Sequence, residues 1–331
     1  MRNFEYVRAA TVPDAREAAT GRPDARFLAG GTTMVDLMKC GVEAPSTLVD
    51  ITRLPGLDGI EVGTDGVRLG SLARMSDVAN DPRIREEFPV LSESLWRGAS
   101  EQLRNMATIG GNLMQRTRCS YFREPATYSA CNKREPGSGC AALEGVNRGH
   151  AVLGTSASCI ATYPGDFAVA LVAFDAQVVV ENGGRRGISA DDFFLLPGDT
   201  PHIEHPVAPT EMILAVEIPA SAALRRSHYL KVRDRESYEF ATASAAVGLE
   251  LEDDGSTVRD VRLAMGGIAT KPWRARAVEA ALTGQRLDEQ TVRAACAQVT
   301  EGAVDHGRNG FKIELAPRVA ARALLNVGGI L

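Results

Sequence analysis

Hydrophobic and polar positions in the first fifty residues alternate over short distances. An apolar stretch at 25–29 ends at a glycine pair, a helical stripe fills 32–40 before a further glycine, and 46–54 is again apolar. Glycine after an apolar stretch and threonine before a helical stripe are typical of a strand-turn-helix boundary. The pattern predicts a small β-turn-α-β unit at the start of the chain.

The middle of the chain mixes short strand-like stretches with one long helical stripe. Residues 56–72 are broken by Gly and Asp-Gly, which predicts hairpins, and 76–95 carries a patchy helical stripe that starts at Ser76 and Asp77. Residues 167–180 are almost continuously apolar and predict buried core, since Asp175 interrupts a run too short to span a membrane. Residues 211–219 predict a strand that ends at a proline.

From about residue 225 the pattern changes. Two long strand-like stretches at 229–255 and 256–268 are followed by Ala- and Arg-rich helical stripes at 274–285, 288–303 and 314–329. We therefore expect an α+β fold with a boundary near residue 222, which separates a first region, 1–222, from a smaller α+β domain, 223–331.

Composition limits the classes of function. The chain has 331 residues, 44% of them hydrophobic and 24% charged, which is enough for a large core and about two domains. A net charge of −5 argues against a nucleic-acid partner, since phosphate binding requires a basic face. The N-terminus lacks the apolar core of a signal peptide, so we do not expect this chain to direct its own export.

Two turns place paired glycines at the predicted start of a helix. The first comprises Gly30, Gly31, Thr32 and Thr33, and the second comprises Thr108, Gly110, Gly111 and Asn112. Glycine lets the backbone approach a ligand, and free N–H groups and hydroxyls can hold phosphate oxygens. Two such turns favour a ligand with two phosphates, such as a dinucleotide. The G-x-G-x-x-G spacing of the Rossmann fingerprint is absent, although Asp50 ends a second strand about twenty residues after the first turn.

Four of the six cysteines fall within one loop-like stretch punctuated by Pro and Gly. They are Cys119, Cys131, Cys140 and Cys159, with gaps of 11, 8 and 18 residues. This spacing fits neither a zinc ribbon nor a bacterial ferredoxin. Two disulfides, an irregular zinc site and an iron–sulfur cluster all remain open on spacing alone. Nearby positive charge suits an anionic cluster and also suits zinc; it comes from Arg116, Arg118, Arg123, Lys133 and Arg134. Cys40 and Cys296 are expected to be buried or partly buried thiols.

Other candidate chemistry is weaker. His150 fits a hydrogen-bonded loop histidine better than a metal ligand, and His202 and His205 flank Glu204 without a third ligand in the sequence. The chain has no G-x-S-x-G or H-E-x-x-H motif, so hydrolysis has no support.

Four segments together resemble the FAD-binding medium subunits of the xanthine dehydrogenase and carbon monoxide dehydrogenase family of molybdenum hydroxylases. They are LAGGTT at 28–33, ATIGGN at 107–112, YPGDFAVAL at 163–171 and EMILAVEIP at 211–219, and the resemblance covers nearly the whole chain. It implies a two-subdomain FAD-binding region of the type found in vanillyl-alcohol oxidase, followed by a smaller flavoprotein C-terminal domain.

The cysteine-bearing loop, at about 115–160, looks closest to that of FAD subunits of bacterial periplasmic aldehyde oxidoreductases. Most medium subunits lack such a loop. The resemblance implies a [4Fe–4S] cluster whose ligands are Cys119, Cys131, Cys140 and Cys159.

The same resemblance implies the residues that bind FAD. The first segment contributes Leu28, Ala29, Gly30, Gly31, Thr32, Thr33 and Met34 around the pyrophosphate, and the second contributes Thr108, Gly110, Gly111 and Asn112. Asp166 would lie at the sugar-chain side of the flavin, Ile213 would contact its ring system and Lys231 would lie near the ring. No residue is expected to act as a catalytic base, because electron transfer requires none.

By resemblance, the chain is an electron-transfer subunit. A large molybdenum partner would oxidise an aldehyde to a carboxylic acid, and a small partner with [2Fe–2S] clusters would pass electrons through FAD to an external acceptor. The three subunits would form a heterotrimer, exported to the periplasm with a partner that bears a twin-arginine signal, or otherwise cytoplasmic. The rival interpretations are a stand-alone flavin oxidase, a zinc-stabilised nucleotide-binding module and a purely structural subunit.

Overall fold

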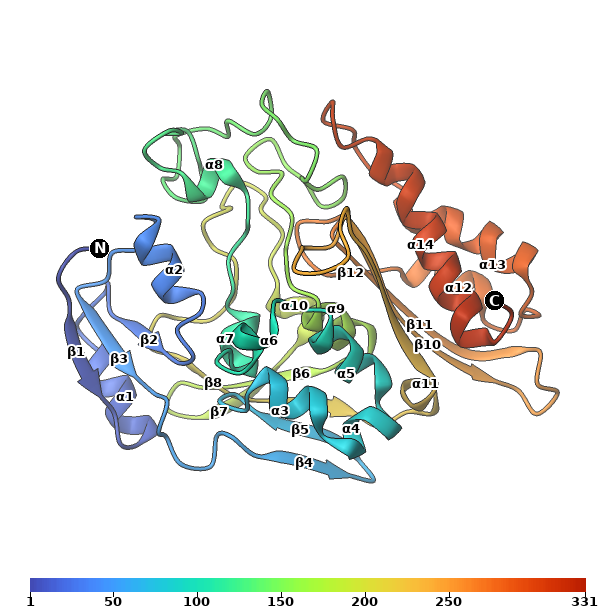
Figure 1. The fold of residues 1–331 in the computed structure, drawn as a ribbon, viewed down its shortest axis with the longest axis horizontal. Coiled ribbons are helices and arrows are strands. Elements are labelled where there is room, and N and C mark those ends of the chain that lie inside the picture. Colours follow the sequence, from blue (N-terminus) through green and yellow to red (C-terminus); the bar gives the residue numbers. More distant parts are fainter.

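The computed structural model describes residues 1–331 and contains three β-sheets (Figure 1). The first sheet is parallel, in the order β1 (Glu5–Arg8), β3 (Thr47–Asp50), β2 (Arg26–Leu28). Helix α1 (Val12–Ala19) follows β1, and α2 (Met34–Lys39) connects β2 to β3. The predicted β-turn-α-β unit is confirmed as β2-α2-β3. Strand β1 and helix α1 were not predicted, although Thr11 and Asp14 form a capping box at the start of α1.

The second sheet forms the centre of the molecule and is antiparallel. Its strands are, in order, β4 (Ile60–Gly63), β5 (Gly66–Gly70), β8 (Met212–Pro219), β6 (Gln177–Glu181) and β7 (Arg185–Ser189). Strand β8 contributes to two cores: Val216 and Ile218 enter the largest hydrophobic core, whereas Met212 and Leu214 pack towards the first sheet. The register shift in the β6–β8 pairing, which skips Leu214, moves these residues to the other face. The first sheet is therefore attached to the start of the central strand β8 by a small core of its own.

The helical stripe predicted over 76–95 is divided into three short helices. They are α3 (Met75–Asn80), α4 (Pro82–Glu87) and α5 (Pro89–Trp96). Proline cannot donate an interior helical hydrogen bond, but it is well suited to the first position of a new helix. Pro82 therefore starts α4 and Pro89 starts α5, so that one predicted helix becomes three. Helix α5 packs against α9 (Phe167–Ala173).

The apolar run at 167–180 forms a helix followed by a strand. All seven residues of α9 are buried, and Asp175 adopts a left-handed conformation (φ 53°) in the turn before β6. A helix that is apolar on every side must be enclosed by protein. Helix α9 lies between the second and third sheets and joins their cores.

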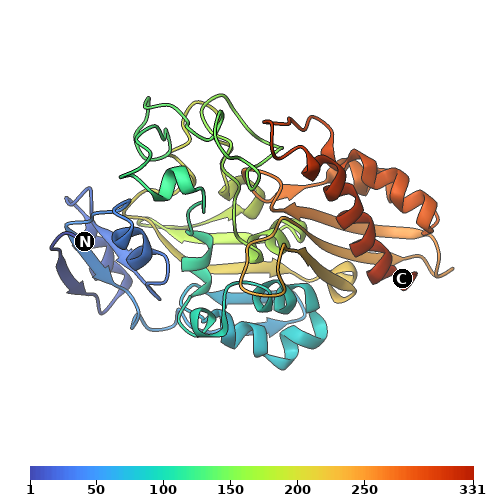
Figure 2. The same ribbon diagram turned by 45° about the horizontal axis from the view of Figure 1, so that its top comes forward.

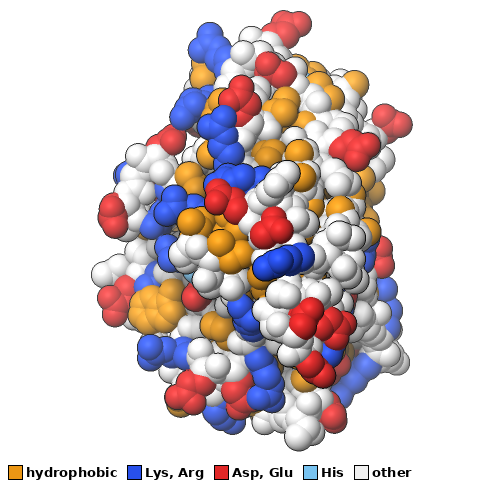
Figure 3. Space-filling view, turned by 90° about the vertical axis from the view of Figure 1, so that its right-hand side faces the viewer, with side chains coloured by type: hydrophobic (Ala, Val, Ile, Leu, Met, Phe, Trp, Pro, Cys, Tyr) orange, Lys and Arg blue, Asp and Glu red, His pale blue; other side chains and the backbone are white.

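The third sheet is antiparallel, in the order β12 (Trp273–Arg274), β11 (Val258–Gly266), β10 (Ala243–Leu251), β9 (Ser227–Val232). It follows the short helix α11 (Ala222–Arg225). One face is covered by α12 (Arg276–Leu282), α13 (Glu289–Cys296), the 3-10 helix η1 (Ala297–Thr300) and α14 (Phe311–Gly328), and the other face meets α9 (Figures 1 and 2). On the side of these C-terminal helices, charged groups of both signs are interspersed over the surface (Figure 3).

A long connection with little regular structure runs from residue 114 to 166. It contains only α8 (Ser120–Arg123) and lies above the central sheet, between the first sheet and the C-terminal helices (Figure 1). Short helices α6 (Glu101–Arg104) and α7 (Ile109–Leu113) precede it, and α10 (Ala190–Phe193) follows β7. None of the helices has the length and apolar character needed to cross a membrane.

Candidate functional site

The two diglycine turns line one cavity of about 520 Å³, hereafter the diglycine cavity. The first turn connects β2 to α2, and the second forms the start of α7. Ten of the residues expected to bind FAD line the cavity: Ala29, Gly30, Gly31, Thr32, Thr33, Met34, Thr108, Gly110, Gly111 and Ile213. Segments about eighty residues apart in the sequence are therefore brought together with the central strand β8.

Close backbone packing holds the two turns together. A Cβ atom at Gly30 would lie only 1.9 Å from the carbonyl oxygen of Met106, just before the second turn. A Cβ atom at Gly110 would lie 2.9 Å from the Cβ of Ser71, at the end of β5. No side chain fits at these positions without movement of backbone, so glycine is required by packing as well as by any ligand.

The two turns differ in their free hydrogen-bond donors. The backbone N–H groups of Gly31, Thr32 and Thr33 have no acceptor within the protein, which leaves them for phosphate oxygens. In the second turn the Gly111 N–H donates to Thr108 Oγ1 (3.2 Å) and the Gly110 N–H donates to the Ser71 carbonyl (2.8 Å). The N–H groups of Gly110 and Gly111 are therefore already hydrogen-bonded within the protein. What these two glycines offer a ligand is close approach to a backbone without side chains. These features fit the pyrophosphate of FAD.

Four expected FAD residues do not line the diglycine cavity: Leu28, Asn112, Asp166 and Lys231. The buried pair Asp166 and Lys231 forms an ion pair of 2.8 Å, and the Tyr229 hydroxyl donates to the other carboxylate oxygen at 2.7 Å. Lys231 also donates to the Arg97 carbonyl (2.9 Å). In the structure this pair connects the start of α9 to strand β9.

An ion-pair network beside the diglycine cavity was not foreseen from the sequence. Arg116 lies 2.8 Å from Glu43 and 2.7 Å from Glu204, and Lys133 lies 2.6 Å from Glu204. Burial opposes ionisation of Glu204, but the two cations outweigh it and lower the pKa of this carboxyl. Glu43, Arg116 and Glu204 line the cavity, so the network joins the segment between α2 and β3, the cysteine-bearing loop and the segment after α10 around it.

All four loop cysteines line one small cavity, which we call the cysteine cavity. Cys119 is the N-terminal cap residue of α8, Cys131 and Cys140 face each other in an antiparallel bridge, and Cys159 lies in a turn. All six cysteines of the chain are free thiols; Cys296 is buried and Cys40 is partly buried, as expected. Four soft thiols around one cavity are a donor set that suits zinc or an iron–sulfur cluster.

The thiols are not arranged as a finished metal site. No group of three or more His, Cys, Asp and Glu side chains has the geometry of metal ligands. Burial raises the pKa of the Cys119 thiol to about 12, so a thiolate at this position would need the positive charge of a metal centre. His150 is closer to this group than expected, because its Nε2 lies 3.2 Å from Cys119 Sγ.

The positive charge expected around the cysteines is largely paired. Arg118 and Arg123 form ion pairs with Asp36, whereas Arg116 and Lys133 pair with Glu204. Arg134 donates to backbone carbonyls of α8. The sequence did not show these carboxylates, since they lie in other segments. Only Lys133 among these five cations lines the cysteine cavity.

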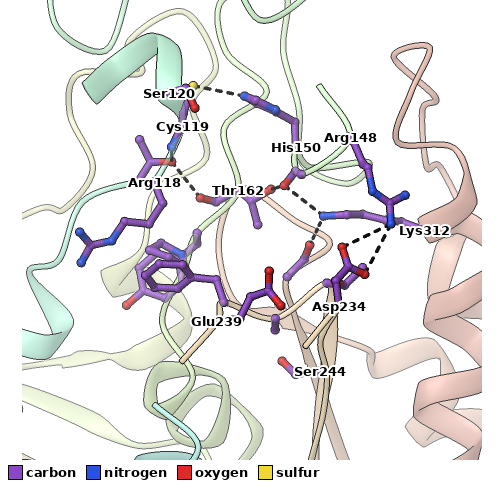
Figure 4. Close-up of a pocket in the computed structure, with 18 of the residues that line it drawn as sticks. Arg118, Cys119, Ser120, Arg148, His150, Thr162, Asp234, Glu239, Ser244 and Lys312 are labelled. Atoms are coloured by element: carbon purple, nitrogen blue, oxygen red, sulfur yellow. Dashed lines mark hydrogen bonds and ion pairs between the residues drawn. The ribbon is translucent and has the colours of Figure 1, made fainter. Parts of the chain in front are cut away.

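A third cavity, of about 330 Å³, lies between the cysteine-bearing loop and the C-terminal domain (Figure 4). Cys119 and His150 lie on one side of it, Asp234 and Glu239 come from the segment after β9, and Lys312 enters from α14. We call this the interdomain cavity.

Comparison with known proteins agrees with this architecture. Residues 2–221 match the family described as FAD binding domain in molybdopterin dehydrogenase, and residues 228–327 match the CO dehydrogenase flavoprotein C-terminal domain. The chain is 46% identical to the aldehyde oxidoreductase FAD-binding subunit PaoB of Escherichia coli K12, with 98% of each chain covered.

More distant relatives extend over most of the chain. It is 26% identical to the glyceraldehyde dehydrogenase medium chain of Sulfolobus acidocaldarius, with 90% of this chain and 87% of the relative covered. A chain of quinoline 2-oxidoreductase from Pseudomonas putida 86 shares the fold, with a TM-score of 0.76, 23% identity and coverage of 99% and 98%. The chain therefore belongs to the FAD-binding medium subunits of the molybdenum hydroxylase family and is an oxidoreductase subunit similar to those of aldehyde oxidoreductases.

Proposed function

We propose that this chain is the FAD- and [4Fe–4S]-binding electron-transfer subunit of a molybdenum-dependent aldehyde oxidoreductase. Electrons from oxidation of an aldehyde to a carboxylic acid would reach FAD from [2Fe–2S] clusters of a partner and leave to an external acceptor. The observation that carries the proposal is the meeting of both diglycine turns in one cavity with three unpaired backbone N–H groups. Similarity to an aldehyde oxidoreductase subunit supports the substrate class.

The residues that line the diglycine cavity would bind the pyrophosphate side of FAD. Gly31, Thr32 and Thr33 would donate to phosphate oxygens, Gly110 and Gly111 would allow close approach, and Ile213 would offer an aliphatic contact. Bound FAD would supply the redox chemistry, while the protein orients it. Leu28, Ala29, Met34, Thr108, Asn112, Asp166 and Lys231 complete the proposed set. Of these, Asp166 and Lys231 would affect FAD binding chiefly by stabilising the fold, because their charged groups form an ion pair with each other.

The four loop cysteines would hold the [4Fe–4S] cluster. Their common cavity supports one shared metal centre, and the free thiols do not support the interpretation as two disulfides. Zinc remains the second candidate, because four thiolates also form a structural zinc site. Metal analysis separates the two.

The proposed assembly contains a large molybdenum subunit and a small [2Fe–2S] subunit, together with this chain. The names of relatives as medium chains or subunits support such an assembly. We propose export to the periplasm with a twin-arginine partner, with the cytoplasm as the alternative. We also propose a domain boundary at residue 222, which gives an FAD-binding domain at 1–222 and a flavoprotein C-terminal domain at 223–331.

Anaerobic co-production with the partner subunits tests the proposal. We expect flavin absorption bands, a broad iron–sulfur absorption and about four irons in addition to those of the partner's [2Fe–2S] clusters. Cys119→Ser, Cys131→Ser, Cys140→Ser or Cys159→Ser should remove about four irons and leave FAD and the partner's [2Fe–2S] iron bound, whereas the control Cys40→Ser should keep all of them. Zinc in place of iron would support the nucleotide-binding module. Substrate oxidation by the isolated chain would support a stand-alone oxidase, and a colourless, metal-free protein would favour a structural subunit.

A further inference from the structure

His150 is the one side chain that forms a hydrogen bond with a loop cysteine. Its Nε2 lies 3.2 Å from Cys119 Sγ (Figure 4). Cys159 Sγ accepts a hydrogen bond of 3.4 Å from the backbone N–H of Ala161, whereas the sulfurs of the two remaining loop cysteines accept none. The four proposed cluster ligands are therefore not equivalent, and only Cys119 has a side-chain partner.

Hydrogen bonds to the C-terminal domain fix the position of His150. Asn309 Nδ2 donates to the carbonyl of Ala151 (2.8 Å), and Lys312 Nζ donates to the carbonyl of Gly149 (3.1 Å). The residues on both sides of His150 are therefore held by α14 and by the segment just before it. The His150 side chain is also buried, and the residue is only 8% exposed. A histidine fixed in this way meets the Cys119 sulfur in one defined geometry.

The partners of the two ring nitrogens indicate which of them carries the proton. His150 Nδ1 is buried without a hydrogen-bond partner, so a proton on Nδ1 would have no acceptor. The Nε2 atom faces the sulfur of Cys119. A free thiol can donate to this nitrogen or accept from it, but a thiolate bound to iron has no proton and can only accept. The tautomer with the proton on Nε2 is therefore the one that fits a bound cluster.

We propose that His150 is a positioning residue that acts through Cys119: its Nε2–H donates to the Cys119 sulfur and raises the reduction potential of the [4Fe–4S] cluster. The inference rests on the proposed function and adds to it a residue that is not a cluster ligand. The reduced cluster carries one more negative charge than the oxidised cluster and shares this charge with the cysteine sulfurs. A donor aimed at one sulfur therefore stabilises the reduced state more than the oxidised state.

Redox titration of the whole complex, followed by low-temperature EPR spectroscopy, measures this effect. His150→Leu removes the N–H group and keeps a side chain of similar size. It should lower the equilibrium constant for one-electron reduction of the four-iron cluster about tenfold, which is a shift of about 59 mV to lower potential. His150→Gln places an amide N–H near the position of Nε2 and should retain most of the wild-type potential.

A matched control removes a second histidine from the same contact between the loop and the C-terminal domain. The His306 Nε2 lies 3.2 Å from Thr155 Oγ1 and meets no thiol. His306→Leu should therefore leave the potential of the cluster unchanged. Equal shifts in His150→Leu and His306→Leu would overturn the inference, because they would come from loosening of the loop rather than from loss of one hydrogen bond.

Histidine labelled with ¹⁵N gives a second readout, which does not require that His150→Leu retain the cluster. Pulsed EPR at the field positions of the reduced four-iron cluster should show a coupling to ¹⁵N in the wild-type complex. The coupling should be absent from labelled His150→Gln, since the amide nitrogen of glutamine is unlabelled. A wild-type cluster without this coupling would overturn the inference.

Iron content separates failure of this inference from failure of the proposed function. A wild-type complex that lacks about four irons beyond those of the [2Fe–2S] clusters would contradict the proposed cluster and the role of His150 with it. If the cluster is present and His150→Leu has the wild-type potential, the inference about His150 is wrong and the proposed function stands. Circular dichroism confirms that each variant is folded.

Discussion

At the scale of single residues, adding one methyl group at Gly30 should have a large effect on stability and on FAD binding. Its missing Cβ is what lets the first turn pack against the carbonyl of Met106, and the obstacle is backbone rather than a flexible side chain. The sequence identified Gly30 as a ligand-binding glycine. It could not show the packing role, because Met106 is distant in the sequence.

Gly30→Ala should therefore lower both stability and FAD content. The added methyl group must push the two turns apart, at a cost of about 1–3 kcal/mol in the free energy of unfolding. Chemical denaturation and the ratio of flavin to protein measure the two effects. The control Gly184→Ala places a methyl group where no atom lies within 4 Å and should change neither. Wild-type flavin content in Gly30→Ala would show that the spacing of the turns does not control binding.

At the scale of elements, local patterns predicted the strands and helices whose signals are contained within a few residues. The unit β2-α2-β3 and the strand that ends at Pro219 are of this kind. The run at 167–180 was identified as core but not as a helix followed by a strand, since a fully buried segment shows no periodicity. Contacts across the sequence were not predictable: Arg116 meets Glu204 and Glu43 at separations of 88 and 73 residues.

The ion-pair network around Glu204 should make the free energy of unfolding decrease as the pH becomes acidic. The pKa of Glu204 is lowered below its ordinary value of 4.5 in the folded protein. Its contribution is therefore complete above about pH 4.5 and is lost as the pH falls through the folded pKa. Glu204→Gln should flatten this part of the stability profile and lower stability at pH 7 by about 3 kcal/mol, because Lys133 is left buried without a partner.

Urea denaturation between pH 3 and 7 measures the Glu204 effect. The control Glu61→Gln removes an exposed partner of Arg68 and should change stability by less than about 1 kcal/mol. An unchanged acid profile in Glu204→Gln would mean that other carboxylates dominate the acid transition.

At the scale of the whole molecule, the two regions that match different families share a buried ion pair in addition to the core that α9 joins. Asp166 starts α9, which belongs to the central core, and Lys231 lies on β9 of the third sheet. The resemblance indicated both residues as neighbours of the flavin. The structure shows that each neutralises the other, with Tyr229 as a third member of the group. Removing one partner of a buried ion pair strongly lowers the free energy of unfolding, whereas replacing both partners by uncharged residues changes it little.

Lys231→Met should therefore destabilise the protein by about 3–5 kcal/mol, because Asp166 is left buried and unpaired. The double variant Asp166→Asn/Lys231→Met removes both charges and should recover most of that loss, which gives a large coupling energy in a double-mutant cycle. Thermal unfolding and flavin content are measured on all four proteins. If the pair serves mainly to position the flavin, the double variant will regain stability but not FAD. If it serves mainly to join the two regions, stability and FAD content will recover together.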